Sequence, residues 1–294
     1  MNNVPFISFR SEQTSNLGFE IVPIERIAQN RKEHTDHNPE LAHQLKFYNL
    51  IYFTEGRGRH FIDFHWYDVA PGTLVYLAKE QVSAFDFSSN LKGYCIVFTD
   101  DFFIDCFSSL ASDFVFRLFN PQLFSPLLQI PAQSDFDDYF YLLKKEFEQS
   151  SSFNYGKIIN ALFIVLISKA ESIKQEQTSL LIETSKITVF KNFKTLLEQN
   201  FGQSRSADFY AKKLAITYKH LNSICKDLVN KTAKNVIDDF VILQAKRSLI
   251  NSSVKSNELA YQLGFEDPTN FSKYFKKHTG LTPNLFAKFN STIH

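Results

Sequence analysis

Two stretches near the carboxyl end of the chain repeat each other and decide the fold of its last third. The first, YAKKLAITYKHLNSICKDLVNKTAKNVI, runs from Tyr210 to Ile237, and the second, LAYQLGFEDPTNFSKYFKKHTGLTPNLF, runs from Leu259 to Phe286. Leu214 matches Leu263 at an offset of 49, and later matches lie 50 apart, so one residue is inserted at a turn. Each stretch reads as a short helix, a tight turn and a second helix.

This layout is that of a helix-turn-helix, which presents its second helix to the major groove of DNA. Between the two motifs, apolar residues at every fourth position predict one long helix of 18 residues, from Ala233 to Ile250. Such a helix is about 27 Å long, and one turn of DNA is about 34 Å. Two motifs held apart in this way can read neighbouring stretches of groove without a partner subunit.

In the first motif, Thr217 is placed to cap the recognition helix. Leu221, Ile224 and Leu228 lie three and four positions apart, and we expect them to face inward with Leu214. The side chains that remain outward are Tyr218, Lys219, Asn222, Ser223 and Lys226. Asn pairs with adenine through two hydrogen bonds, and Lys binds guanine or phosphate, so this face is predicted to contact DNA.

In the second motif, Asp267 and Pro268 form a strong helix start, with Asp as the cap and Pro at the first helical position. Phe271, Tyr274 and Phe275 are expected to face inward. The outward residues are Thr269, Asn270, Ser272, Lys273, Lys276 and Lys277. We expect Thr269, Asn270 and Lys273, near the helix start, to reach bases, and Lys276 and Lys277 to contact phosphates. An isolated lysine is most often a solvated surface charge, but these lysines share a face with Asn and Ser.

The charge of the chain is divided between its two parts. The net charge of +1 combines −8 for residues 1–185 with +9 for residues 186–294. A basic block joined to an acidic one is typical of a nucleic-acid-binding module attached to a part that does not bind nucleic acid. The basic block coincides with the repeated motifs.

The first part of the chain, from about 17 to 115, is predicted to form short strands. The β-branched and aromatic runs are NLIYF, HFIDF, TLVYL, SAFDF and GYCIVF, and turn-rich segments separate them. This spacing is typical of a sandwich or a small barrel. Gly56 and Gly58 predict a hairpin turn, and Pro71-Gly72 predicts a turn with Pro second and Gly third.

From about 101 to 174 the periodicity becomes helical, and prolines interrupt it. The longest apolar run, Ile158 to Ile167, is too short to span a bilayer, and the first residues lack a signal-peptide pattern. We therefore expect a cytoplasmic protein that does not enter a membrane. Three widely spaced cysteines, Cys95, Cys106 and Cys225, indicate neither a disulfide framework nor a zinc site, and we expect them to be buried.

The C-terminal block resembles the DNA-binding domain of AraC/XylS-type transcription regulators. The segment ELAYQLGFEDPTNFSKYFKKHTGLTPNLF, Glu258 to Phe286, carries this resemblance most specifically, and the match covers about residues 187–290. It implies two helix-turn-helix subdomains that bind promoter DNA. The family positions that approach bases match Lys219, Asn222, Ser223, Thr269, Asn270 and Lys273. Ser223 stands where an Arg is common, so fewer contacts are expected there.

The segment from His43 to Leu77 is similar to the cupin-like barrel that many such regulators carry, and Gly93 to Phe103 is similar to its exit. The resulting fold class is a multidomain α+β protein. It comprises a cupin-like, effector-sensing barrel (1–115), a helical dimerisation segment with a linker (116–185), and an all-α domain of two helix-turn-helix subdomains joined by a long helix (186–294).

A metal-dependent cupin enzyme with a DNA-binding tail is the rival hypothesis. A metal cupin needs a His-x-His pair, a Glu and a later His, whereas this chain has His43, Leu45, Asn49 and Ser83 at those positions. One of four ligands remains, so we expect no metal, no cofactor and no enzymatic activity. His34, His37, His60 and His65 lie nearby in the sequence, and we expect them to be surface or hydrogen-bonded residues.

The leading hypothesis is a DNA-binding regulator controlled by a small molecule in the barrel. A regulator whose barrel is purely structural is the third alternative. The expected partners are double-stranded promoter DNA, an effector, a second copy of the chain, and RNA polymerase. The basic pair Arg57 and Arg59 could bind an acid or could be solvated. An activator is expected, with repression as the alternative.

Overall fold

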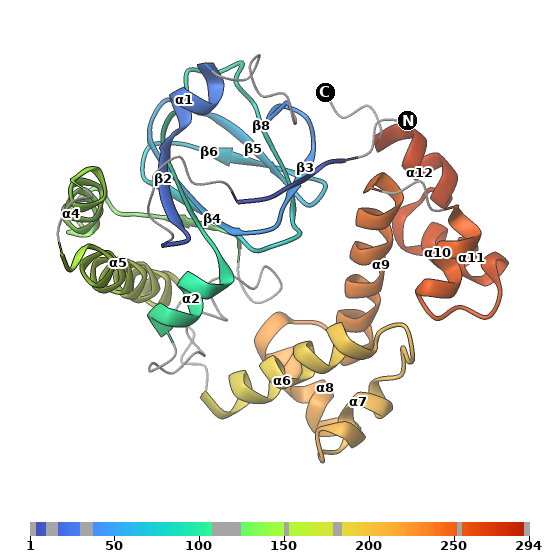
Figure 1. Cartoon of the computed structure of the whole chain (residues 1–294). Helices are drawn as coiled ribbons and strands as arrows, with labels where there is room; N and C mark the ends of the chain where they lie inside the picture. The colour runs from blue at the N-terminus through green and yellow to red at the C-terminus, as the bar shows by residue number, and fades with distance from the viewer. Residues whose placement is uncertain are drawn as a thin grey trace. The chain divides into compact units, whose positions relative to one another are not determined.

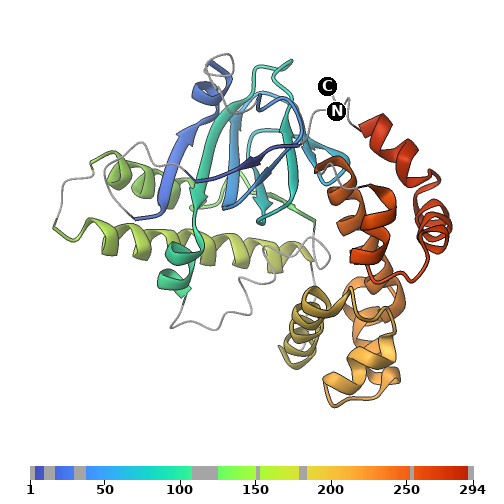
Figure 2. The same ribbon diagram turned by 45° about the vertical axis from the view of Figure 1, so that its right-hand side comes forward.

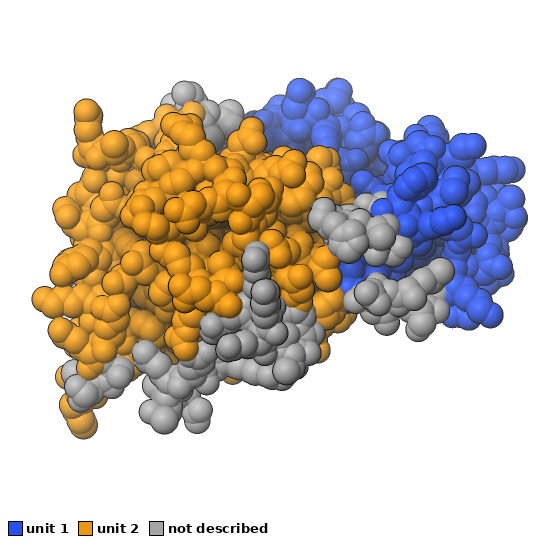
Figure 3. Space-filling model, turned by 90° about the horizontal axis from the view of Figure 1, so that it is seen from above, with its two compact units in different colours: residues 1–4, 181–294 blue, residues 5–180 orange. Residues whose placement is uncertain are grey.

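The computed structural model describes residues 4–9, 17–29, 38–107, 125–149, 153–178, 184–251 and 255–290. The chain forms two compact units, shown in different colours in Figure 3. The N-terminal unit is Pro5–Leu180, and the C-terminal unit is Leu181–His294 together with Met1–Val4. The boundary predicted near residue 115 lies outside the described residues and stays a prediction.

Two five-stranded sheets form the body of the N-terminal unit (Figure 1). The first sheet has the order β1 (Phe6–Ile7), β3 (His43–Leu45), β8 (Val82–Phe85), β5 (Gly58–Ile62) and β6 (His65–Val69). The second has the order β10 (Leu127–Gln129), β7 (Thr73–Leu77), β4 (Tyr48–Glu55), β9 (Lys92–Phe98) and β2 (Phe19–Pro23). All neighbouring pairs are antiparallel except β1 and β3. The predicted strand-rich, barrel-like architecture is confirmed.

Alternation along the strands separates two hydrophobic cores. On β4, Ile51 and Phe53 face a core between the two sheets, whereas Leu50 and Tyr52 face a core between the second sheet and the helices. The helices of this unit are α1 (Ile24–Gln29), α2 (Asp100–Phe107), α4 (Phe136–Glu148) and α5 (Tyr155–Thr178). Figures 1 and 2 show α4 and α5 side by side against one sheet. Within the described residues, no helix is both long and apolar enough to cross a bilayer.

The turn prediction at Pro71-Gly72 is confirmed. The amide of Thr73 donates a hydrogen bond to the carbonyl of Ala70 at 2.9 Å, and Gly72 has a φ of 84°. A positive φ at the third position is what this turn type requires, and glycine adopts it without steric strain. The turn places β7 for pairing with β4 and β10.

The hairpin prediction at Gly56 and Gly58 is wrong, because β4 and β5 belong to different sheets. Gly56 is instead required by close packing, since a Cβ there would lie 2.3 Å from the carbonyl oxygen of Asn90. The sequence pattern shows a need for glycine, but it does not show whether a turn or a backbone contact causes the need.

Further elements differ from the sequence prediction, and strand β1 lies before the stretch that was predicted to form strands. Strand β6 follows β5 through a tight turn in which Asp63 and Phe64 have φ values of 44° and 72°. Such turns are usually recognised in a sequence by Asn-Gly or Asp-Gly. This turn has Asp-Phe instead, so the hairpin was not predicted. Strand β10 interrupts the stretch from 101 to 174 that reads as helical, and helix α1 was not predicted. Both are short, and tertiary pairing decides such elements more than periodicity does.

The regular secondary structure in the described part of the C-terminal unit consists of helices. Its helices are α6 (Thr184–Asn200), α7 (Ala207–Lys213), α8 (Tyr218–Val229), α9 (Ala233–Asn251), α10 (Ser256–Gln262), α11 (Pro268–Thr279) and α12 (Pro283–Asn290). One face of α6 is buried, and it carries Ile187, Phe190, Phe193, Lys194 and Leu197. The long connecting helix is present as α9, with 19 residues, and it contacts α7 and α8 as well as α10 and α12.

Candidate nucleic-acid interface

The first motif consists of α7 and α8. The Thr217 side chain accepts a hydrogen bond from the amide of His220 at 3.1 Å, which confirms its predicted capping role. Leu221, Ile224 and Leu228 are buried as predicted, and Cys225 is buried beside them. Packing of this apolar face determines which side of α8 remains available to DNA.

Four of the predicted contact residues on α8 are exposed: Tyr218, Lys219, Ser223 and Lys226. Asn222 is half-buried, and its Oδ1 atom accepts a hydrogen bond from the amide of Ala233 at 3.1 Å. Ala233 is the first residue of α9, where backbone amides lack partners within the helix. A two-bond pairing of Asn222 with adenine would need this oxygen, so the structure couples Asn222 to the start of the connecting helix.

The second motif consists of α10 and α11. The Asp267 side chain accepts a hydrogen bond from the amide of Thr269 at 2.7 Å, and Pro268 is the first helical residue, as predicted. Phe271 and Phe275 are fully buried, whereas Tyr274 is half-buried. The other predicted residues of α11 lie on the opposite side: Thr269, Asn270, Lys273, Lys276 and Lys277 are exposed, and Ser272 is half-buried.

The backbone of the two motifs repeats in the same way as the sequence does. Ala215 and Gly264 occupy matching turn positions and have φ values of 55° and 75°. Asn230 and Gly280 end the two recognition helices, with φ values of 52° and 77°. Left-handed residues at matching positions show that each motif makes the same turn, although only the second uses glycine throughout.

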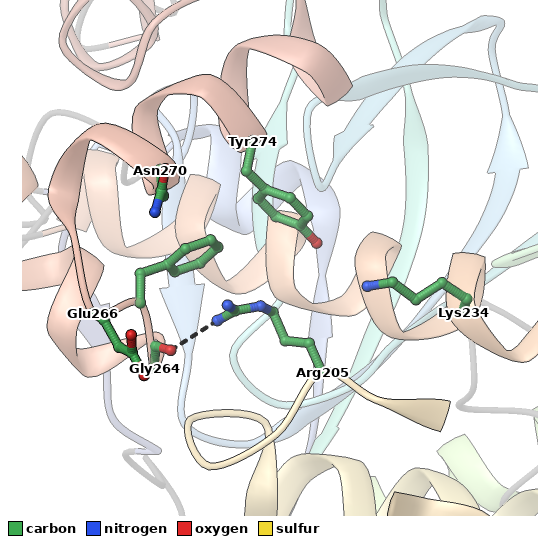
Figure 4. A pocket seen from close by; sticks show the side chains of 7 residues that line it. Arg205, Lys234, Gly264, Glu266, Asn270 and Tyr274 are labelled. Carbon is green, nitrogen blue, oxygen red and sulfur yellow. Dashed lines mark hydrogen bonds between the residues drawn. The ribbon is translucent and has the colours of Figure 1, made fainter. Parts of the chain in front are cut away.

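A cleft of about 520 Å³ adjoins the start of α11 (Figure 4). It is lined by Arg205, Lys234, Gly264, Phe265, Glu266, Asn270 and Tyr274. Arg205 comes from the loop after α6, and Lys234 comes from the first turn of α9. Sequence reasoning missed Arg205, because a single Arg in a polar loop carries no pattern and its contacts lie about 60 residues away along the chain.

The C-terminal unit also contains a buried lysine. Lys194 lies 4% exposed on α6, with its amino group 4.5 Å from the centroid of the Phe240 ring on α9. Burial lowers the pKa of Lys194 to about 8, partly offset by Glu198. This side chain joins α6 to the connecting helix.

The histidines expected near a cupin metal site are placed differently from one another. His43 and Ser83 are paired across β3 and β8, and Nε2 of His60 lies 3.0 Å from Oγ of Ser83. His60 is fully buried, whereas His65 is exposed. His34 and His37 lie outside the described residues. Within the parts of the chain that the structure describes, no three His, Cys, Asp or Glu side chains are grouped to hold a metal ion.

Polar atoms without partners occur in the barrel. The Nδ1 atom of His60 and the Oδ1 atom of Asn49 are both buried, and neither has a hydrogen-bond partner among the described residues. Burial, with a smaller contribution from His43, lowers the pKa of His60 to about 3, so the imidazole is neutral near pH 7. The three cysteines are buried as expected, and burial raises the pKa of each thiol to about 12.

Both units of the chain match family models of known proteins. Residues 210–288 match the family model of a helix-turn-helix domain, and residues 26–154 match that of an AraC-like ligand-binding domain. The chain is 30% identical over 105 residues to a probable transcription factor, PqrA, of Proteus vulgaris, covering 36% of this chain and 84% of that protein.

A second relative is an uncharacterized HTH-type transcriptional regulator of Pseudoalteromonas carrageenovora. It is 33% identical over 100 residues, and the match spans 34% of this chain and 59% of that protein. A solved structure of ToxT from Vibrio cholerae O395, bound to (E)-4-(8-methylnaphthalen-1-yl)but-3-enoic acid, is 16% identical. It has a TM-score of 0.46 and covers 86% of this chain and 93% of that chain.

The matches agree with the order of the two units along the chain. The ligand-binding model lies within the N-terminal unit, and the helix-turn-helix model covers both motifs from α7 to α12. The resemblance inferred from the residues is therefore confirmed, and the chain belongs to the AraC family of transcription regulators, with an AraC-like ligand-binding domain followed by a DNA-binding helix-turn-helix domain.

Proposed function

We propose that α8 and α11 enter neighbouring stretches of the major groove of one promoter site and read its sequence. The observation that carries this proposal is the division of each recognition helix into a buried apolar face and an exposed polar face, which carries Tyr, Lys and Ser on α8 and Thr, Asn and Lys on α11. The connecting helix α9 is about 28 Å long, close to the ~34 Å turn of DNA, which suits two helices that enter on the same side.

The residues of α11 have different proposed roles. Thr269, Asn270 and Lys273 lie in its first two turns and contact bases, whereas Lys276 and Lys277 lie further along and contact phosphates. On α8, Tyr218, Lys219, Ser223 and Lys226 form the corresponding face. Asn222 is given a supporting role, because its oxygen already caps α9.

Replacing Asn270 or Lys273 by Ala should weaken binding to the specific site by about 1–3 kcal/mol, because each substitution removes a direct base contact. The measurement is the dissociation constant on a site selected from random DNA, compared with random duplex at the same salt concentration. Salt must be held constant because phosphate contacts make affinity strongly salt-dependent.

Lys277→Ala is the matched control. A phosphate contact weakens binding to both duplexes to a similar extent, so the preference for the selected site should stay unchanged. Equal losses on selected and random DNA for Asn270→Ala would contradict the base-reading role.

The N-terminal unit is proposed to bind a small-molecule effector between its two sheets. The supporting observation is that the interior of the barrel contains polar side chains. Asn49 and His60 are buried there, and each has an atom without a hydrogen-bond partner among the described residues. A ligand that binds only the folded state must raise the melting temperature. We expect one class in a screen of sugars, fatty acids and aromatic acids to raise the melting temperature of the barrel. The unfolding of the barrel is monitored by the fluorescence of Trp66, the only tryptophan. A purely structural barrel would show no shift with any of them.

A regulatory role is proposed in place of an enzymatic one. Leu45, Asn49 and Ser83 occupy three of the four positions that a metal cupin needs for its ligands. A cytoplasmic location is proposed as well, because the proposed partner is promoter DNA. Activation, with RNA polymerase as a further partner, is the proposed direction of regulation and rests on the family resemblance.

A homodimer through α5 is also proposed. Ile158 and Val165 are 37% and 38% exposed, and Ala161, also exposed, lies between them on the same helical face, whereas Leu162 packs in part against the core of its own unit. An apolar stripe at this spacing suits helix pairing between two copies. Sedimentation equilibrium of the full chain distinguishes this dimer from a monomer.

A further inference from the structure

The two motifs are joined by a second connection besides α9. The Nη1 atom of Arg205, in the loop that precedes α7, donates hydrogen bonds to the carbonyl oxygens of Leu263 and Gly264, both at 3.0 Å. Its guanidinium carbon lies 3.6 Å from the centroid of the Phe265 ring. Figure 4 shows Arg205 reaching from the first motif to the turn between α10 and α11.

The backbones of the same two segments are in direct contact. A Cβ on Gly264 would lie 2.1 Å from the carbonyl oxygen of Gly202, and a Cβ on Gly202 would lie 3.0 Å from the carbonyl oxygen of Gln262. The two segments could not approach each other so closely if a larger residue replaced either glycine. The contact is therefore between main chains, which are stiffer than long surface side chains.

The recognition helix of the second motif is tied to the beginning of α9. The hydroxyl of Tyr274 donates a hydrogen bond to Oδ1 of Asp238 at 2.8 Å, and its ring centroid lies 5.2 Å from that of Phe265. Lys234, one turn earlier on α9, forms an ion pair with the same carboxylate at 2.5 Å. Both motifs are thus connected to one point near the start of the connecting helix, through Arg205, Phe265, Tyr274 and Asp238.

If α9 alone joined the two motifs, they could bend and twist relative to each other. A second contact between them removes much of that freedom. Preorganisation of two binding elements lowers the entropy lost on binding and favours one separation of their targets. We propose that Arg205, supported by Gly202, is a positioning residue. It holds α8 and α11 at one separation and angle, and so makes the protein select DNA whose two blocks have one spacing. This inference rests on the proposed function, that both helices read DNA.

The test compares the wild-type chain with Arg205→Ala and Arg205→Lys on the selected site and on derivatives. The derivatives carry insertions of about one or two base pairs, or about half a helical turn, between the two blocks. We expect the wild type to bind the selected spacing best. Arg205→Ala should bind it roughly tenfold more weakly and discriminate among the spacings several-fold less.

Arg205→Lys separates geometry from charge. Lysine keeps the positive charge but lacks the planar fork that reaches two carbonyls and stacks on a ring. It should lose the spacing preference as Arg205→Ala does. Lys212→Ala, which removes an exposed cation from α7 of the first motif, is the control and should leave the ratio between spacings unchanged. Thermal unfolding confirms that each variant is folded.

The proposal would be overturned if Arg205→Ala weakened binding equally at all spacings. It would also be overturned if Arg205→Lys kept the wild-type ratio of affinities between spacings. In either case Arg205 would act only through its charge. The outcome for the proposed function is separate. Wild-type chain that binds selected and random duplex equally would refute the reading of DNA itself, whereas wild-type selectivity with unchanged spacing preference in both variants refutes only the positioning role.

Discussion

Gly264→Ala should lower the free energy of unfolding of the C-terminal unit by at least about 3 kcal/mol, whereas Gly280→Ala should lower it by about 1–2 kcal/mol. The two glycines have nearly the same left-handed backbone, with φ values of 75° and 77°. They differ in the space around the missing Cβ, which lies 2.1 Å from the Gly202 carbonyl at Gly264 and has no neighbour within 4 Å at Gly280. The left-handed conformation costs both variants about 1–2 kcal/mol. Only Gly264→Ala must also separate two backbone segments.

Urea unfolding followed by far-ultraviolet circular dichroism measures this difference. Trp66 lies in the N-terminal unit, so loss of helix without a change in its fluorescence reports on the C-terminal unit. Equal losses of stability in the two variants would show that the turn at Gly264 is not held against Gly202.

The N-terminal unit should lose stability as the pH falls below about 6.5, by up to about 1.4 kcal/mol per pH unit for His60. Burial lowers the pKa of His60 in the folded state to about 3, from 6.5 in the unfolded chain. Between these values the unfolded chain binds a proton that the folded chain does not bind, so stability rises with pH. The stabilisation is complete above pH 6.5 and is lost progressively toward pH 3. Burial lowers the pKa of His43 as well, and it adds to the slope in the same direction.

The measurement is the free energy of unfolding by urea, from Trp66 fluorescence, at several pH values between about 4 and 8. His60→Gln cannot be protonated and can still hydrogen-bond to Ser83, so it should show a shallower pH dependence than the wild type. A variant with the wild-type slope would mean that His60 is accessible to protons in the folded protein.

Local signals predicted the recognition motifs well. Thr217 and Asp267 cap the helices that their positions indicated, and Leu221 and Phe271 are buried as their spacing required. A cap and a helical face depend on residues within about four positions of each other, which a sequence displays directly. The Pro71-Gly72 turn is local for the same reason.

Elements that depend on distant partners were predicted less well. The Asp63-Phe64 turn lacks the usual glycine, and Gly56 is required by Asn90 rather than by a hairpin. Asn222 shares a helical face with the contact residues, yet its oxygen is used by Ala233. In each case a partner outside the helical or strand repeat decides the role of the residue.

The amino-acid sequence by itself determined that the chain has two helix-turn-helix motifs, a long helix between them and a preceding strand-rich unit, because these follow from short-range periodicity, capping and turn residues. Only the tertiary structure decided how the two motifs are joined and which polar residues lie inside the barrel. Arg205 meets Gly264, and His60 meets Ser83, across segments that are far apart in sequence. Such contacts arise when whole elements pack together, and no local pattern encodes them.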